Sequence, residues 1–266
     1  MRILIILSSL FLMACSNQTE QKTEQAHTND IKVQKINPLV ASIQEAHQLD
    51  ELRKKEIVSF DIKLTFRGNE RLNARIYSTT NSSKVLVKNS ENTRLLFDGN
   101  EIWIHPKDSL YEGARFDALT WSYFFMAPFK LNDPGTHHTQ AEKMSYQNED
   151  SLMSSKLTFG ENIGDAPDDW YILYQNENSN LLEAMAYIVT FGGREQEKAA
   201  QNPHAISYSD YKKVEGIPFA HKWKFWNWSE KNGLEDQLGE ATISNIQFTD
   251  DHSVFNKSKE AAPVPK

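Results

Sequence analysis

The sequence has a single cysteine, Cys15, among its 266 residues. The folded part of the chain therefore has no disulfide and no thiolate chemistry, and its stability must come from a hydrophobic core. Positive charge is not in excess either, because 36 acidic residues outweigh 29 basic ones and give a formal net charge of −7. This balance argues against nucleic acid or anionic lipid headgroups as the main partner.

Short motifs of enzymes are also missing. The chain has no Gly-x-Ser-x-Gly, His-Glu-x-x-His, Walker, Gly-x-Gly-x-x-Gly or paired-cysteine motif. A hydrolase that works with two carboxylates leaves no short motif, so this alternative stays open. We nevertheless expect a binding protein, with no enzymatic activity and no cofactor.

Two groups of side chains contain potential metal ligands. His137 and His138 follow a turn and point apart on an extended chain, and no further ligand lies at a suitable spacing. Asp165, Asp168 and Asp169 lack the loop spacing of a calcium motif and are interpreted as a solvated turn. We therefore expect no metal site.

Long hydrophobic runs are absent, since the N-terminal run of Ile3 to Leu7, resuming at Leu10, is shorter than the roughly 20 residues that span a bilayer. It follows Arg2 and leads to Leu12-Met13-Ala14-Cys15. This order is typical of a bacterial lipoprotein signal. We expect residues 1–14 to be a removed signal peptide and Cys15 to be the lipidated N-terminus. Because Ser16, and not Asp, follows the cysteine, the expected location is the outer membrane, facing the periplasm.

Composition divides the rest of the chain into three parts. Residues 15–36 begin with the cysteine that we expect to be lipidated. Their polar composition predicts a disordered tether. Residues 37–250 are long enough for one domain, which we expect to be a monomer. Residues 251–266 are polar with Pro263 and Pro265, and their composition predicts a disordered tail.

Hydrophobic periodicity changes along this domain. Asn37-Pro38 is a helix start, followed by an amphipathic stripe that leads to the basic residues 53–55. From Val58 to Phe66 apolar and polar residues alternate, which predicts a half-buried strand. Gly68-Asn69 and Asp98-Gly99 predict hairpin turns, and the aromatic stretch from Phe116 to Met126, ended by Pro128, predicts a second helix.

These signals predict about eleven strands and two helices, without β-α-β alternation. The further strands are expected at residues 72–76, 85–87, 95–97, 102–104, 152–159, 170–174, 182–191, 204–214, 217–228 and 241–248. The predicted fold class is mainly β: a curved antiparallel sheet, or unclosed half-barrel, whose apolar face is covered by a helical lid. Such a sheet leaves an apolar interior that suits an apolar ligand.

Residues Leu95 to Pro106 read LLFDGNEIWIHP. This segment resembles the DG-x-x-(L/I)-W-x-Y-x-P strand pair of the outer-membrane lipoprotein-carrier superfamily of LolA and LolB, with His105 in the place of the usual Tyr. The order of elements is also similar to that family and to half-barrel lipoproteins of the Bacteroidota. The resemblance implies an unclosed barrel that holds acyl chains in its concave face.

Two family features are not matched. Carriers have an Arg-Pro pair whose arginine latches the lid, whereas Arg75 is followed by Ile76. The anchored acceptor has an apolar residue on a protruding loop, whereas the comparable residues 88–92 are polar. Neither role can be assigned to this chain.

The leading hypothesis is an anchored protein that binds a lipid or the acyl chain of a lipoprotein. Its predicted cavity residues lie on inward faces of strands or on the aromatic helix, and they are Phe60, Ile62, Leu64, Phe66, Trp103, Trp121, Phe124, Phe219, Trp223 and Phe225. Trp226 and Trp228 alternate with these and are expected on the outer face. They support the alternative of a glycan- or protein-binding module.

Overall fold

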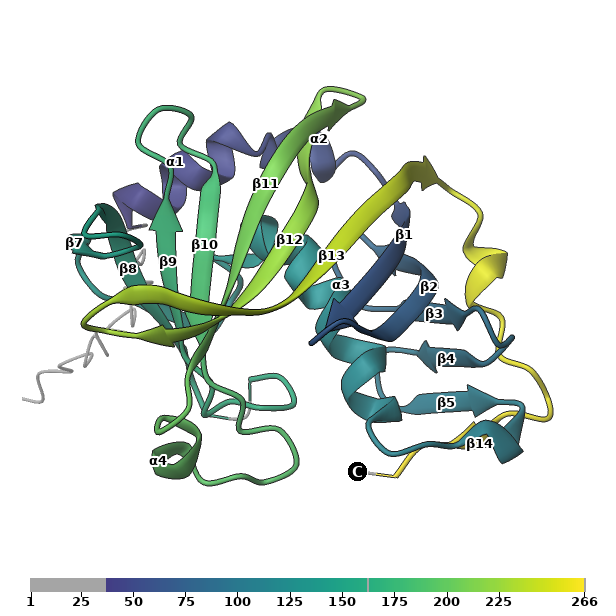
Figure 1. Ribbon diagram of the computed structural model, residues 1–266. Coiled ribbons are helices and arrows are strands. Elements are labelled where there is room, and N and C mark those ends of the chain that lie inside the picture. The colour runs from purple at the N-terminus through teal and green to yellow at the C-terminus, as the bar shows by residue number, and fades with distance from the viewer. Residues whose placement is uncertain (1–36, 162, 266) are drawn as a thin grey trace, which may run out of the picture. The chain divides into compact units, whose positions relative to one another are not determined.

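The computed structural model describes residues 37–161 and 163–265. A 14-stranded antiparallel sheet dominates it, in the order β14-β5-β4-β3-β2-β1-β13-β12-β11-β10-β9-β8-β6, with β7 paired to β8 (Figure 1). The strands are β1 (Ile57–Phe66), β2 (Asn69–Thr79), β3 (Val85–Asn89), β4 (Arg94–Phe97), β5 (Ile102–His105), β6 (Thr136–His138), β7 (Glu142–Ser145), β8 (Ser151–Phe159), β9 (Tyr171–Gln175), β10 (Leu182–Tyr187), β11 (His204–Val214), β12 (Ile217–Ser229), β13 (Gly233–Thr249) and β14 (Ala262–Pro263).

The path of paired strands ends at β14 on one side and at β6 on the other, so the sheet does not close. This confirms the predicted half-barrel. The short strands β6, β7 and β14 were not predicted, because two to four residues are too few to show an alternation. The signal peptide, Cys15 and the tether lie outside the described residues.

Four α-helices accompany the sheet, together with two short 3-10 helices, η1 (Lys107–Ser109) and η2 (His252–Phe255), within the described ranges. They are α1 (Pro38–Ala46), α2 (Leu49–Leu52), α3 (Ala114–Lys130) and α4 (Gln196–Ala199). In Figure 1, α3 lies between the arm formed by β2–β5 and the arm formed by β8–β12. Its packing against both arms creates the main hydrophobic core.

The first helix begins as predicted and ends earlier than predicted. Asn37 caps it by accepting a hydrogen bond from the amide of Leu39 (2.9 Å), and Pro38 occupies the first turn. Gln48 has a left-handed backbone (φ 58°), which ends α1 before α2 begins. This break places His47, which is 1% exposed, inside the core.

The second predicted helix also forms, but Pro128 does not end it. Pro128 lies inside α3 and has no amide proton to donate to the carbonyl of Phe124, four residues earlier. The hydroxyl of Tyr208 on β11 donates to this carbonyl instead, at 3.0 Å. A side chain of the sheet thus supplies the hydrogen bond that the proline removes.

A second, smaller core lies on the outer face of β9–β11. The long β12–β13 hairpin extends beyond the inner core, and Trp228 near its end packs with Tyr174 and Trp170. The amide of Leu234 donates to the carbonyl of Tyr146 (2.6 Å), in the turn between β7 and β8. The sheet is therefore covered by side chains on both faces in this region.

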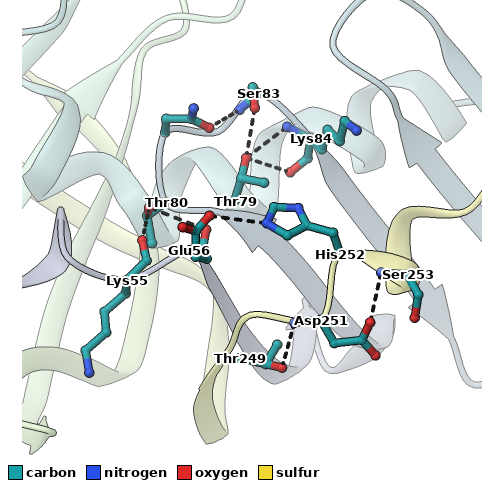
Figure 2. A network of polar contacts seen from close by, with 11 residues as sticks. Lys55, Glu56, Thr79, Thr80, Ser83, Lys84, Thr249, Asp251, His252 and Ser253 are labelled. Carbon is teal, nitrogen blue, oxygen red and sulfur yellow. Dashed lines mark hydrogen bonds and ion pairs between the residues drawn. The ribbon is translucent and has the colours of Figure 1, made fainter.

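The C-terminal segment packs on the sheet, so the predicted disorder of residues 251–266 is wrong for the segment that contains η2 and β14. Phe255 and Val264 are buried, and the amide of Val264 donates to the carbonyl of Ile102 (2.8 Å) beside the β14–β5 pair. At the other end of this segment, His252 contacts Glu56 at 3.2 Å (Figure 2). The composition is polar, but a few apolar side chains and backbone hydrogen bonds suffice to dock the segment.

None of the helices in the described residues is long and apolar enough to cross a membrane.

Candidate functional site

A cavity of about 590 Å³ lies between α3 and the two arms of the sheet. The first arm contributes residues around the ends of β3 and β4, and the second contributes β8–β10 with the loops that follow β8 and β10. Aromatic and aliphatic side chains form most of the wall: Val85, Phe97, Phe116, Leu119, Tyr123, Phe124, Phe159, Ile163, Tyr171, Tyr187, Val189 and Phe191. The cavity therefore occupies the gap that the unclosed sheet leaves.

One face of α3 lines the cavity and another packs against the sheet. Phe116, Leu119 and Tyr123 follow the three- and four-residue spacing of one helix face and line the cavity. Trp121 and Phe125 lie on another face and pack into the core. This division explains how a single helix both covers the sheet and forms a wall of the cavity.

The core face of α3 is closely packed. The ring of Phe125 stacks between Phe60, at a centroid distance of 3.9 Å, and Phe219, at 5.0 Å. Trp121 and Phe225 form a T-shaped contact with a centroid distance of 6.1 Å. Such contacts fix α3 against the sheet, so the space available for a ligand lies on its other side.

A buried carboxylate holds the N-terminal turns of α3. Asp117 is 1% exposed and accepts two hydrogen bonds from the guanidinium of Arg71 on β2, at 2.7 and 3.0 Å. Tyr111 donates to it at 2.8 Å, as does the indole of Trp121 at 2.8 Å. Four donors compensate the desolvation of this carboxylate, so the contact stabilises the position of α3.

Aromatic rings continue from α3 across the wall. Tyr123 lies 5.5 Å from Tyr171, and Phe124 lies 5.1 Å from Tyr187. Burial raises the pKa of all three tyrosines, so their phenols are uncharged at neutral pH. The wall thus combines apolar surface with a few neutral hydroxyl groups.

The charged residues of the wall are engaged in specific contacts. Arg115 pairs with Asp165 through two hydrogen bonds, of which the one from Nε measures 2.9 Å. Asp169 accepts hydrogen bonds from the amide and hydroxyl of Thr190, at 2.7 and 2.8 Å. Burial raises the pKa of Asp169 although these two donors act against the shift. Arg115, Asp165 and Asp169 thus have partners within the protein.

A model described as a family of unknown function, DUF6503, matches residues 70–234. The chain belongs to the DUF6503 family. A comparison with curated proteins finds no match.

Solved structures of low sequence identity have a fold similar to that of this DUF6503 protein. A LolA superfamily protein from Nitrosomonas europaea is 11% identical with a TM-score of 0.52, covering 81% of this chain and 97% of that chain. A DUF1329 family protein from Desulfovibrio piger is 12% identical with a TM-score of 0.53, covering 83% and 98% respectively. These likenesses confirm the fold that the resemblance of residues 95–106 to the carrier superfamily implied.

Of the predicted cavity residues, Phe124 lies on the wall of the observed cavity. Most of the others pack in the core between α3 and the sheet, and they are Phe60, Ile62, Leu64, Phe66, Trp121, Phe219, Trp223 and Phe225. Trp103 lies apart from them in a small cluster with Leu96 and Phe255. Its indole donates to Asp98 (2.7 Å), and together with amide hydrogen bonds from Glu101 and Asn100 this outweighs the effect of burial and lowers the pKa of Asp98.

The two outer tryptophans are less accessible than predicted. Trp228 is only 6% exposed, and its indole donates to the hydroxyl of Tyr174 at 2.9 Å. Its prediction as an exposed contact residue is wrong, because the β12–β13 hairpin folds over the outer face. Trp226 is half-buried, donates to Ser207 (2.9 Å) and lies beneath the ammonium group of Lys224.

Three of the potential metal ligands, His138, Asp165 and Asp169, have other side-chain partners. A ring nitrogen of His138 contacts the carbonyl of Leu131 at 2.7 Å, and the side chain of His137 is exposed. Asp165 and Asp169 bind Arg115 and Thr190, as described above. No group of three or more potential ligands gathers within the described ranges.

Sequence reasoning missed most of the cavity wall. One signal was available: Phe116, Leu119 and Tyr123 form an apolar face of the predicted helix in addition to the face that covers the sheet. A helix that is apolar on several sides must contact more than one surface. The contributions of Tyr171, Tyr187 and the loop after β8 depend on the curvature of the sheet, which local patterns do not define.

Proposed function

We propose that this DUF6503 protein is a lipid-anchored protein of the outer membrane, facing the periplasm, that binds the apolar chain of a lipid or lipoprotein. The cavity between α3 and the sheet carries this proposal. Its volume of about 590 Å³ lies within the range of roughly 300–1,000 Å³ for small-molecule sites. Its wall is mostly aromatic and aliphatic, so it offers an acyl chain a dry surface.

Burial of an acyl chain supplies enough free energy for binding. Each methylene transferred from water contributes about 0.8 kcal/mol. A chain with ten buried methylenes therefore gains about 8 kcal/mol before the entropy of association is subtracted. Neither a metal ion nor a covalent bond is needed for such a complex.

The alternative of a glycan- or protein-binding surface receives less support. It depended on Trp226 and Trp228 lying together on an exposed face. Trp228 is instead buried beside Tyr174, and the indole nitrogen of Trp226 is engaged by Ser207. The best apolar surface for a ligand thus lies inside the molecule.

Leu119→Trp tests the cavity, because the larger side chain fills space that a ligand would occupy. We expect the affinity for a neutral naphthylamine dye, measured by equilibrium dialysis with the mature chain lacking its acyl groups, to fall about tenfold or more. The melting temperature should change little if the indole enters open space.

Leu110→Trp is the matched control, since Leu110 is 49% exposed and does not line the cavity. It should bind the dye like the natural chain. If Leu119→Trp binds the dye as tightly as Leu110→Trp and the natural chain, any apolar site lies elsewhere and the proposal is overturned.

A further inference from the structure

The cavity wall contains two cations, Arg115 and Lys130, and three carboxylates, Asp133, Asp165 and Asp169, in the described part of the chain. Both cations are already paired. Arg115 binds Asp165 in a two-pronged contact, and the ammonium group of Lys130 lies 2.5 Å from Asp133. A negatively charged ligand would therefore have to displace a carboxylate of the protein to obtain a partner.

The carboxylates of these pairs lie nearer to solvent than the cations. The side chain of Asp165 is 34% exposed and that of Arg115 only 15%, while the values are 45% for Asp133 and 19% for Lys130. The more exposed member of each pair is therefore acidic, which disfavours the approach of an anion. The formal charge of −7 for the whole chain acts in the same direction.

Among the described residues, the remaining charged group of the wall is acidic, and its tyrosines are neutral. The carboxylate of Asp169 is satisfied by Thr190, and Tyr123, Tyr171 and Tyr187 present phenol groups. A phenol can donate to, or accept from, an uncharged hydroxyl or ester group. It does not neutralise a buried charge, whose transfer from water without a partner is costly.

From these pairings we infer that the cavity selects amphiphiles with one apolar chain and an uncharged head, such as an alcohol or a glycerol ester, over fatty acids and phospholipids. This inference rests on the proposed function and names its ligand class. The inference is based on the pairing of both cations of the wall with carboxylates of the protein.

Dodecanol and dodecanoate test this selectivity, because they share a chain and differ in the charge of the head. Each is titrated against the bound naphthylamine dye at pH 8 in equilibrium dialysis. We expect dodecanol to displace the dye at about tenfold lower concentration than dodecanoate. Equal or stronger displacement by dodecanoate would overturn the inference but not the proposed function. Failure of both ligands together with absent dye binding would overturn the proposed function itself.

Asp165→Asn separates the ion pair from the general preference of apolar sites for neutral molecules. The substitution releases Arg115 as a partner for a carboxylate, so the preference for dodecanol should fall about fivefold. Asp236→Asn makes the same change of charge at an exposed position of β13 and should leave the preference unchanged. An unchanged preference in Asp165→Asn, or the same fall in both variants, would overturn the role of the Arg115–Asp165 pair.

Discussion

At the scale of single residues, His47 connects the break between α1 and α2 to the core. Its ring lies 5.5 Å from both Phe129 and Tyr211, and one ring nitrogen accepts a hydrogen bond from the amide of Leu182 at 3.1 Å. Burial lowers the pKa of His47 to about 3. The folded protein therefore holds a neutral imidazole where the unfolded chain would be protonated in mild acid.

This difference predicts a loss of stability in acid. Because the pKa of His47 is lower in the folded than in the unfolded state, its contribution is complete above about pH 6.5 and is lost as the pH falls toward 3. At about pH 5 the loss relative to pH 8 is on the order of 2 kcal/mol. His47→Asn keeps an acceptor for Leu182 and should reduce the loss, as measured by urea unfolding at both pH values.

Burial also lowers the pKa of His138, His204 and His221, so the variant should retain part of the acid sensitivity. His137→Asn removes an exposed imidazole and serves as the control. Its unfolding free energy should depend on pH as that of the natural chain does. An identical pH dependence in His47→Asn would show that this residue does not control acid unfolding.

At the scale of secondary-structure elements, α3 depends on a partner in the sheet. Tyr208, which is 3% exposed, donates to the carbonyl that Pro128 leaves without an intrahelical partner. Tyr208→Phe leaves this buried carbonyl unsatisfied and should cost about 1–3 kcal/mol of unfolding free energy. Thermal or urea unfolding measures this loss.

The same substitution should cost less in a Pro128→Ala background. Alanine supplies the amide proton that proline lacks, so the carbonyl of Phe124 regains its helical hydrogen bond. A double-mutant cycle should therefore give an interaction energy of about 1 kcal/mol or more between these positions. Additive effects would contradict the compensation between Tyr208 and Pro128.

Elements with long or local sequence signals could be predicted from the sequence. Long alternating runs such as Val58 to Phe66 identified strands, and Asn37-Pro38 identified the start of α1, because these signals are local. The helical break at Gln48 and the burial of Trp228 were missed. Both result from tertiary packing, in which His47 enters the core and the β12–β13 hairpin covers the outer face.

At the scale of the whole molecule, the sequence pattern predicted an open sheet with an apolar interior. Most of the side chains predicted to line a ligand cavity pack in the core instead. Phe60 and Phe219 enclose Phe125, and the cavity lies on the opposite side of α3. Periodicity identifies which side chains face inward. It does not show which of them meet another side chain and which face empty space, since this depends on how far the two arms are apart.

The proposed membrane anchor concerns the whole molecule and rests on the Leu12 to Cys15 motif. Cys15→Ser removes the thiol that accepts the lipid, so we expect an unprocessed precursor that retains the signal peptide. Immunoblotting of membrane fractions measures both size and location. Ser16→Thr keeps the motif and should be processed normally. A Cys15→Ser protein that is processed and still fractionates with the outer membrane would contradict the anchor.

The docked C-terminal segment also bears on how copies of the chain behave when crowded together. An open sheet has two free edges, and a long free edge can pair with the edge of a neighbouring copy and lead to aggregation. Here one end of the sheet is β14, which is 2 residues long, and the other end consists of β6 and β7, which are 3 and 4 residues long and both pair with β8. Neither offers an extended row of backbone donors and acceptors, so the sheet can remain unclosed around its cavity without becoming a template for its neighbours.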